Sequence, residues 1–546
     1  MRSACTLLLL AACGPQVVVD GDTDDTGVVD PFASFPAPDA WGGTSGPGAP
    51  SRTFTEAELF QACSWLQGDA DRESDHHNLV VMYDGWLVMP WAPEWGPQRK
   101  AVTEDCGLAQ VPTPEAPGDV TSCPGRFGGG LTFWDVSDPC DPVKVGEGWT
   151  PWMRESHALG FAEVDGRVYA AVDFLGVEGD GGVGFWDITD VSAPVFVSWV
   201  RLPGHAYPDS YLRLTLSVFW QGRYVYASSA GHGVFVVDAA DPLHPVVVDT
   251  VPDDDAAWAI KLEGEGVHHG GTFHVWGNRA MASAAGISST FLVDLSDPTQ
   301  AVLEVGGSFS PQDDEGDPLQ YYFANLGSRY GLFARNQAGG GPLVVDITDP
   351  TAPVTVAHLH QPEGDGGYIF QHGDRLFQGE SNFGAVYGFD GTTLVEEGRF
   401  ELKGDLDTVT PIGNVAFVAV DERADDGKAT SLVPWSTAPD ADPPRPGMTS
   451  PGDGATLQAV TSRIGVVFDE MIEPVSAFPG SFRVATEDGR PVEGLIQVQE
   501  NIVNFSPRAD LEPDTTYVVQ LPAGGLVDLS GNALADTLTW SFRTAP

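Results

Sequence analysis

Three histidines recur at one place in a repeated pattern, and their spacing could support metal chemistry. They are His77, His157 and His269, and each lies 8 or 9 residues before a glycine that begins a tight turn. Asp365 and Asp405 hold the same offset in two later repeats. A ring of imidazoles and carboxylates can bind a divalent or transition-metal ion. This predicts a candidate metal site at the three histidines. In the alternative interpretation they are hydrogen-bonding residues at strand ends, or line a water-filled channel.

Motifs of the common enzyme classes are missing from the chain. There is no GxSxG, HExxH or P-loop sequence, and no GxGxxG that follows a strand. The sequence therefore assigns no catalytic residue and favours a protein that is not an enzyme. No cofactor is indicated beyond the divalent or transition metal of the histidine hypothesis.

A phrase repeated six times predicts the architecture that must position these histidines. Each copy is an apolar strand that ends in Asp, as in LTFWDVSDP and LVVDITDP. The six aspartates are 44 to 56 residues apart: Asp135, Asp187, Asp238, Asp294, Asp346 and Asp390. Such a period indicates a propeller or a solenoid, because one unit cannot bury both of its faces alone. We expect each aspartate to cap the turn that follows its strand.

A second landmark completes the repeat. Seven tight turns, each between two apolar strands, are centred on Gly85, Gly166, Gly222, Gly277, Gly327, Gly373 and Gly413. With the strand that ends in Asp and the run that follows it, each unit has four strands in an antiparallel meander. Seven such units predict an all-β fold with a seven-bladed β-propeller, which avoids exposed sheet edges by closing its ring.

The N-terminus has the features of an export signal. Arg2 supplies a positive charge, and a short apolar run precedes Leu10-Ala11-Ala12-Cys13. These four residues resemble the lipobox of bacterial lipoproteins. The resemblance implies a signal peptide over 1–12, a lipid on Cys13 and a location at the outer membrane or cell surface. Residues 13–50 are acidic and rich in Pro and Gly, so we expect a solvated tether.

The charge of the chain limits its partners. Twenty-seven basic residues against 77 acidic residues give a net charge of −50. This charge argues against nucleic acid as a ligand. The membrane is expected as a partner only through the lipid anchor.

Four further cysteines belong to the exported part of the chain. An even number of cysteines in an exported protein favours two disulfides. Two of the four, Cys106 and Cys123, lie in a Pro-rich insertion over about 92–129. We expect Cys106–Cys123 and Cys63–Cys140, with the insertion over one mouth of the propeller channel as the main ligand contact. The alternative pairing is Cys63–Cys106 with Cys123–Cys140.

The repeated phrase resembles the LVIVD-repeat family of secreted β-propeller proteins, with LVVDITDPTAP (343–353) as its clearest copy. The resemblance covers about residues 75–400 and implies fold and exterior location but little chemistry. We expect the propeller to occupy residues 51–438.

The pattern changes after a Pro-rich joint at 439–446. Residues 447–546 resemble the bacterial Ig-like domain of surface-layer and adhesin-type proteins, on Phe468, the Phe505-Ser-Pro corner, Tyr517 and the final Trp540 and Phe542. The resemblance implies a β-sandwich without a site of its own. We expect the joint to be exposed and the two modules to fold separately.

Two functions fit these observations. The first is a lipid-anchored cell-surface binding protein whose propeller head binds an unknown protein or glycan. The alternative is a metal-dependent exported enzyme that uses the histidine ring at the propeller channel.

Overall fold

The computed structural model describes residues 30–66, 75–76, 79–93, 129–150, 153, 156–175, 181–202, 215–229, 233–248, 270–284, 289–402, 404–421 and 430–546. These residues form β-strands and one 3-10 helix, η4 (Pro474–Ser476). Within them no helix is long and apolar enough to cross a membrane. The protein is therefore all-β throughout its described part.

Seven sheets follow one another along the described part of residues 64–434, which we call the propeller-like part. Sheet 1 contains β2 (Asp75–His76), β3 (Val81–Tyr83), β4 (Trp86–Pro93), β5 (Gly129–Asp135) and β6 (Val143–Thr150). Sheet 2 contains β7 (Leu159–Val164), β8 (Arg167–Leu175), β9 (Gly181–Asp187) and β10 (Val195–Arg201). Sheet 3 contains β11 (Thr215–Gln221), β12 (Tyr224–Ser229), β13 (Gly233–Asp238) and β14 (Val246–Val247).

The later sheets repeat this order. Sheet 4 contains β15 (Gly270–Trp276), β16 (Arg279–Ala284), β17 (Thr290–Asp297) and β18 (Gln300–Phe309). Sheet 5 contains β19 (Tyr321–Gly327), β20 (Tyr330–Arg335), β21 (Pro342–Asp346) and β22 (Val354–His358). Sheet 6 contains β23 (Ile369–His372), β24 (Arg375–Gly379), β25 (Gly384–Phe389) and β26 (Leu394–Phe400). Sheet 7 contains β27 (Asp405–Ile412), β28 (Val415–Asp421), β29 (Thr430–Pro434) and β1 (Ser64–Leu66).

The two landmarks of the repeat fix the ends of the strands. Each predicted glycine turn joins the first hairpin of a sheet, with a positive φ at the glycine, or at Ser328 in sheet 5. Each of the six predicted aspartates accepts a hydrogen bond from the backbone N–H two residues later, at 2.6 to 3.1 Å. The expected turn-capping role of these aspartates is confirmed.

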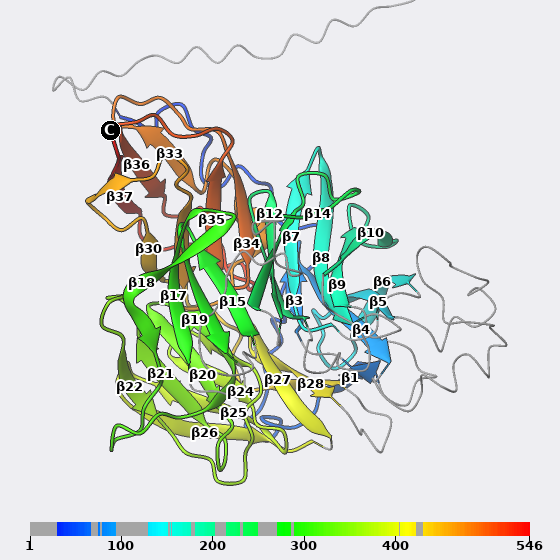
Figure 1. Cartoon of the computed structure of the whole chain (residues 1–546). Coiled ribbons are helices and arrows are strands. Elements are labelled where there is room, and N and C mark those ends of the chain that lie inside the picture. Colours follow the sequence, from blue (N-terminus) through cyan, green and yellow to red (C-terminus); the bar gives the residue numbers. More distant parts are fainter. Residues whose placement is uncertain are drawn as a thin grey trace, which may run out of the picture.

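The sheets are arranged around a common axis (Figure 1). The first strands of neighbouring sheets contact one another in the order β7, β11, β15, β19, β23 and β27. Tyr83 of β3 and Phe161 of β7 extend this series, with ring centroids 4.8 Å apart. The first hairpin turns of the sheets therefore lie at one end of the axis.

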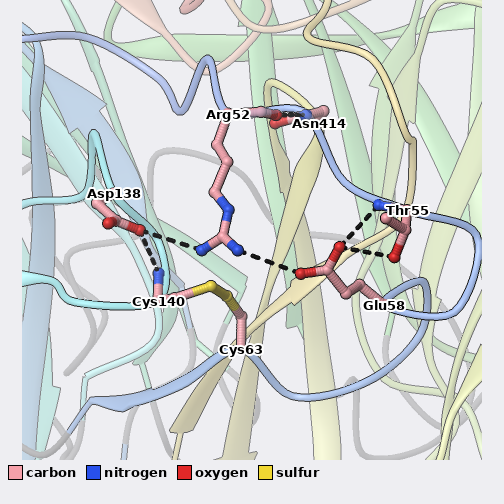
Figure 2. Close-up of a disulfide and its surroundings, with 7 residues drawn as sticks. All are labelled: Arg52, Thr55, Glu58, Cys63, Asp138, Cys140 and Asn414. Carbon is pink, nitrogen blue, oxygen red and sulfur yellow. Dashed lines mark hydrogen bonds and ion pairs between the residues drawn. A yellow bond between two sulfur atoms is a disulfide. The ribbon is translucent and has the colours of Figure 1, made fainter.

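The N-terminal strand completes the last sheet. β1 pairs antiparallel with β29, and Ser64 lies opposite Leu432. A disulfide joins Cys63, just before β1, to Cys140 in the loop between β5 and β6 of sheet 1 (Figure 2). Arg52 lies beside this disulfide and pairs with Glu58 at 3.1 Å and with Asp138 at 3.6 Å. Sheet 7 is therefore bonded covalently to sheet 1.

The C-terminal sandwich consists of two four-stranded sheets. One contains β30 (Pro446–Ser450), β32 (Ile464–Phe468), β35 (Ile502–Pro507) and β34 (Gly494–Gln499). The other contains β31 (Ala455–Gln458), β37 (Leu538–Thr544), β36 (Thr516–Leu521) and β33 (Arg483–Thr486). Phe468, Phe505, Tyr517, Trp540 and Phe542 all belong to its buried core.

Residues 30–50 differ from the solvated tether that we expected over 13–50. Phe32 is buried, the Pro36 carbonyl accepts a hydrogen bond from Arg483 at 2.8 Å, and Ala49 N–H donates to the Leu529 carbonyl at 3.0 Å. The apolar residues at 32, 35 and 49 account for this packing. The acidic, Pro-rich composition of the segment does not predict it. Residues 13–29 lie outside the described part.

Candidate functional site

The C-terminal sandwich is docked on the end of the propeller-like part that carries the first hairpin turns (Figure 1). Glu473 accepts hydrogen bonds from the backbone N–H groups of Asp84 and Gly85, at 2.7 and 3.1 Å. Asn504 accepts one from Gly277 N–H at 2.8 Å. The turn glycines suit this role, because their exposed N–H groups can be approached closely without a side chain in the way.

Backbone carbonyls of the sandwich bind two more of the turns. The Phe468 carbonyl accepts from Ser328 N–H at 2.9 Å, and the Asp469 carbonyl accepts from Gly373 N–H at 3.1 Å. The sandwich therefore contacts turns of several sheets through the chain segment that ends β32.

The hairpin of β34 and β35 reaches the first strands of several sheets, which lie next to the axis. Gln499 accepts from Trp220 N–H at 3.0 Å and donates to the Val218 carbonyl at 2.7 Å. Glu500, at the tip, accepts from Asn325 of β19 at 2.9 Å and lies 4.0 Å from His274 of β15. Side chains of this one hairpin therefore bind the first strands of sheets 3, 4 and 5.

Burial shifts the pKa values of the ionisable side chains at this interface. Desolvation raises the pKa of Glu500 to about 7, against the hydrogen bond from Asn325, and lowers the pKa of His274 to about 3. Desolvation likewise raises the pKa of Glu473 to about 7, although backbone hydrogen bonds from Asp84, Gly85 and Val475 favour the carboxylate. This interface therefore holds carboxyl groups that favour the protonated form more than ordinary Glu.

Apolar residues of the sandwich pack into the hydrophobic clusters of the propeller-like part. Met471 and Leu529 of the sandwich belong to the same buried cluster as side chains of sheets 1 to 3. Val467 and Ile502 belong to the cluster of sheets 3 to 5. The joint is also partly buried, with Pro444 inside. The joint is therefore less exposed than we expected, and apolar residues of the sandwich contribute to the hydrophobic clusters of the propeller-like part.

A group of metal-binding side chains lies at this boundary. One ligand atom each of His372, Asp440 and Glu470 lie within 4.8 Å of one another. His372 ends β23, Asp440 is in the joint and Glu470 follows β32. The three residues line a cavity of about 660 Å³ between sheet 6 and the sandwich. We call them the boundary cluster.

Several carboxylates crowd the boundary cluster. Burial, together with Asp528, Asp440 and Asp469, raises the pKa of Glu470 to about 10. Burial lowers the pKa of His372, against the nearby Asp440 and Asp469. Burial also raises the pKa of Asp528 to about 7. The carboxyl groups of this region are buried close together, so some of them favour the protonated form.

Comparison with known families places the C-terminal part. Residues 440–544 match the family model of the bacterial Ig-like domain. The Ig-like domain accordingly begins within the joint, and it occurs in extracellular bacterial proteins. The disulfide Cys63–Cys140 fits an exported protein as well. The match does not reach the repeats, so the LVIVD resemblance stays a prediction.

Solved structures give only distant matches to the propeller-like part. A protein from Lactobacillus plantarum is 15% identical over 57% of this chain and 93% of its own, with a TM-score of 0.42. A putative 6-phosphogluconolactonase from Bacteroides fragilis is 12% identical over 57% and 92%, with a TM-score of 0.39. BamB from Moraxella catarrhalis is 10% identical over 56% and 78%, with a TM-score of 0.33. At these scores none of them indicates a function. No curated protein matches the chain.

Of the three predicted metal ligands, only His157 lies within the described residues. It precedes β7, at the end of the axis away from the Ig-like domain, and its side chain is 5% exposed. Its backbone N–H and that of Ala158 donate to Asp173 at 3.0 and 2.6 Å, and its Nδ1 lies 3.4 Å from the same carboxylate. This arrangement is that of a hydrogen-bonded strand end. His77 and His269 lie outside the described residues.

The predicted disulfides are only partly visible. Cys63 and Cys140 are bonded, with their Cα atoms 4.7 Å apart. This is one pair of the pairing we expected, and it differs from the alternative. Cys106, Cys123 and the insertion around them lie outside the described residues, as does Cys13.

Reasoning from the sequence missed the residues that dock the Ig-like domain. The sequence QVQENIVNF (497–505) contained a sign of this docking, because Gln and Asn alternate there with apolar residues along two short strands. Gln497, Gln499, Asn501 and Asn504 are nonetheless buried. Long amide side chains repeated on one edge of a sandwich indicate a partner backbone to which they can bind.

Proposed function

We propose that this chain is a lipid-anchored cell-surface binding protein. A closed seven-bladed β-propeller with LVIVD-type repeats forms the head, and the Ig-like domain covers one of its two faces. A lipid on Cys13 holds the protein at the outer membrane or cell surface. The ligand is a protein or a glycan.

One observation carries this proposal: the Ig-like domain occupies the end of the axis that bears the first hairpin turns. Asn504 and Glu473 bind turn backbone there, and Glu500 accepts a hydrogen bond from Asn325 of the inner strand β19. The opposite end, near His157 and Glu380, is therefore the end available to a ligand. Concave loop faces on rigid β scaffolds are common binding sites.

The available end is built on a rigid framework. Glu380, between β24 and β25, is fully buried and accepts hydrogen bonds from Tyr387 Oη at 2.8 Å and Gly341 N–H at 3.1 Å. Burial raises the pKa of Glu380 to about 8. Because this carboxyl already has two donors, we assign it to the support of the loops of sheets 5 and 6 and not to ligand binding.

The anchor is tested by fractionation of cells that express the wild type and Cys13→Ala. The wild type should sediment with the outer membrane and be degraded by proteinase K added to intact cells, whereas Cys13→Ala should be released. A Cys13→Ala protein that stays as firmly in the membrane contradicts the anchor. Cys5→Ser is the matched control, since it removes a cysteine outside the lipobox and leaves the Cys63–Cys140 disulfide intact.

The binding face is tested by screening the purified protein on glycan and peptide arrays. Hydrogen exchange with the best-bound array compound should then show new protection beside Glu380 and His157. New protection confined to the turns at Gly85 and Gly277 would place the ligand on the covered face and contradict the proposal.

A further inference from the structure

The boundary cluster joins residues from both parts of the protein. His372 Nδ1 lies 3.4 Å from Glu470 Oε2, and His372 Nε2 lies 3.8 Å from Asp440 Oδ2. These separations exceed the 2.7–3.2 Å of an N–H···O hydrogen bond. The two distances start from opposite nitrogens of the ring, and only one of these nitrogens can bind a given ion. With one atom taken from each residue, the three ligand atoms lie within 4.8 Å of one another.

The Glu470 carboxylate is a buried group without a donor. The residue is 3% exposed, and within the described part of the chain no N–H or O–H group donates to it. Its contact is the imidazole at 3.4 Å. A buried carboxylate ordinarily accepts hydrogen bonds or binds a cation. Asp528, close by, shows the satisfied case, with bonds from Ser530 N–H and Asn532 N–H at 2.8 Å each.

The imidazole of His372 is held in place by its surroundings. Its ring lies edge-on to Trp435 and Phe377, with centroids 5.5 and 6.3 Å away. Asp440 is held by a hydrogen bond from Asp442 N–H at 3.1 Å. Ligands that are oriented before the ion arrives bind it more tightly.

The cavity beside the cluster supplies an entrance. Asp374, Asp442 and Asp536 line the same cavity beside Arg375 and Arg445, so acidic side chains outnumber basic ones along the approach. Such a charge favours the arrival of cations. Water from the cavity can complete the coordination, because three protein ligands leave a position open on a tetrahedral ion.

From this geometry we propose that His372, Asp440 and Glu470 bind one Zn²⁺ ion, which links sheet 6 to the Ig-like domain. One imidazole nitrogen and two carboxylates form a mixed nitrogen and oxygen set, which suits zinc better than calcium or magnesium. Because the ligands come from three segments, the ion strengthens the docking of the Ig-like domain on the propeller-like part.

The test is zinc binding to the full-length protein after treatment with a chelator. Titration should give about one tight equivalent for the wild type. Glu470→Gln and His372→Gln should each weaken that binding at least about tenfold, a loss expected even for second-shell partners. Asp536→Asn, in the same cavity, and His244→Gln, beside Asp241 on the surface, should bind zinc like the wild type.

Two further readouts separate a metal site from a folding defect. Zinc should raise the thermal unfolding midpoint of the wild type and leave that of Glu470→Gln unchanged, while both proteins keep the same circular dichroism spectrum. Co²⁺ in place of zinc should give absorption bands of a four- or five-coordinate nitrogen and oxygen site in the wild type alone.

Three results would overturn the proposal. The first is no zinc bound above background by the folded wild type. The second is equal zinc binding by the wild type and both cluster variants, with loss on His244→Gln, because the ion then belongs to the surface pair. The third is a preference for Ca²⁺ or Mg²⁺ over Zn²⁺, which would show that the class of ion is wrong.

Discussion

Gln499 pairs with Trp220 as if it were the backbone of an added strand. Its Oε1 accepts from Trp220 N–H at 3.0 Å, and its Nε2 donates to the Val218 carbonyl at 2.7 Å. The two groups belong to β11, whose edge faces the Ig-like domain. One side chain thereby satisfies a donor and an acceptor that burial would otherwise leave without partners.

Gln499→Ala should destabilise the whole protein. The change leaves two buried backbone groups unpaired, which costs about 1–3 kcal/mol for each group that water cannot reach. The free energy of unfolding in urea measures this loss. Gln458→Ala is the control, because the Gln458 amide donates only to Thr456 of its own strand, β31. An equal loss in the two variants would mean that Gln499 has no special role in docking.

The full chain should unfold in one cooperative transition. Met471, Leu529, Val467 and Ile502 of the Ig-like domain are buried in the hydrophobic clusters of the propeller-like part, so those clusters lose side chains when the domain is removed. A fragment of residues 447–546 should therefore melt at a lower temperature than the full chain and bind a hydrophobic dye. Differential scanning calorimetry checks this expectation. Two well-separated transitions in the full chain would contradict it.

Glu500→Gln should stabilise the protein at high pH only. The folded-state pKa of Glu500 is about 7 against an ordinary 4.5, so its contribution to stability is full below pH 4.5 and is lost as the pH rises through 7. The glutamine keeps an acceptor for Asn325 and has no proton to lose. At pH 8 the variant should gain up to about 3 kcal/mol, since each pKa unit corresponds to about 1.36 kcal/mol.

The measurement is urea unfolding of both proteins at several pH values between 4 and 8. The advantage of Glu500→Gln should grow with pH. Glu315→Gln, at an exposed position, should show no such trend. A gain that is constant over the whole range would show that ionisation of Glu500 is not its cause.

Loss of the Cys63–Cys140 disulfide should destabilise the propeller-like part. The bond spans 77 residues, and closing a loop of that length costs the unfolded chain up to about 4.5 kcal/mol of conformational entropy. The double variant Cys63→Ser, Cys140→Ser should lose a measurable part of this in urea unfolding without reductant. If the double variant unfolds at the same urea concentration as the wild type, the bond does not constrain the unfolded state.

The sequence predicts the repeated part of the fold well, because its signals are local. A glycine with positive φ, as at Gly85, and an aspartate that caps its own turn, as at Asp135, act within a few residues. The Ig-like domain was recognisable for the same reason, since its core aromatic residues alternate along short strands. These signals do not say how two folded parts meet.

The docking and the boundary cluster could not be predicted in this way. Glu473 reaches Asp84 across 389 residues, and His372 meets Glu470 only because two separate parts pack together. The histidine hypothesis relied on a regular offset, yet His157 has its partner, Asp173, within its own sheet. A periodic pattern identifies positions that are equivalent in successive repeats. The boundary cluster is formed by residues that hold different positions in the fold.

The pairing of β1 with β29 sets an order on the biogenesis of this protein. Ser64 leaves the ribosome early, but its partner Leu432 is made only after six of the seven sheets have been synthesised. The first strand therefore stays unpaired until the last sheet of the propeller-like part has been made. A chain that is cut short anywhere before Thr430 keeps a bare sheet edge, which proteases can recognise as the mark of an unfinished protein.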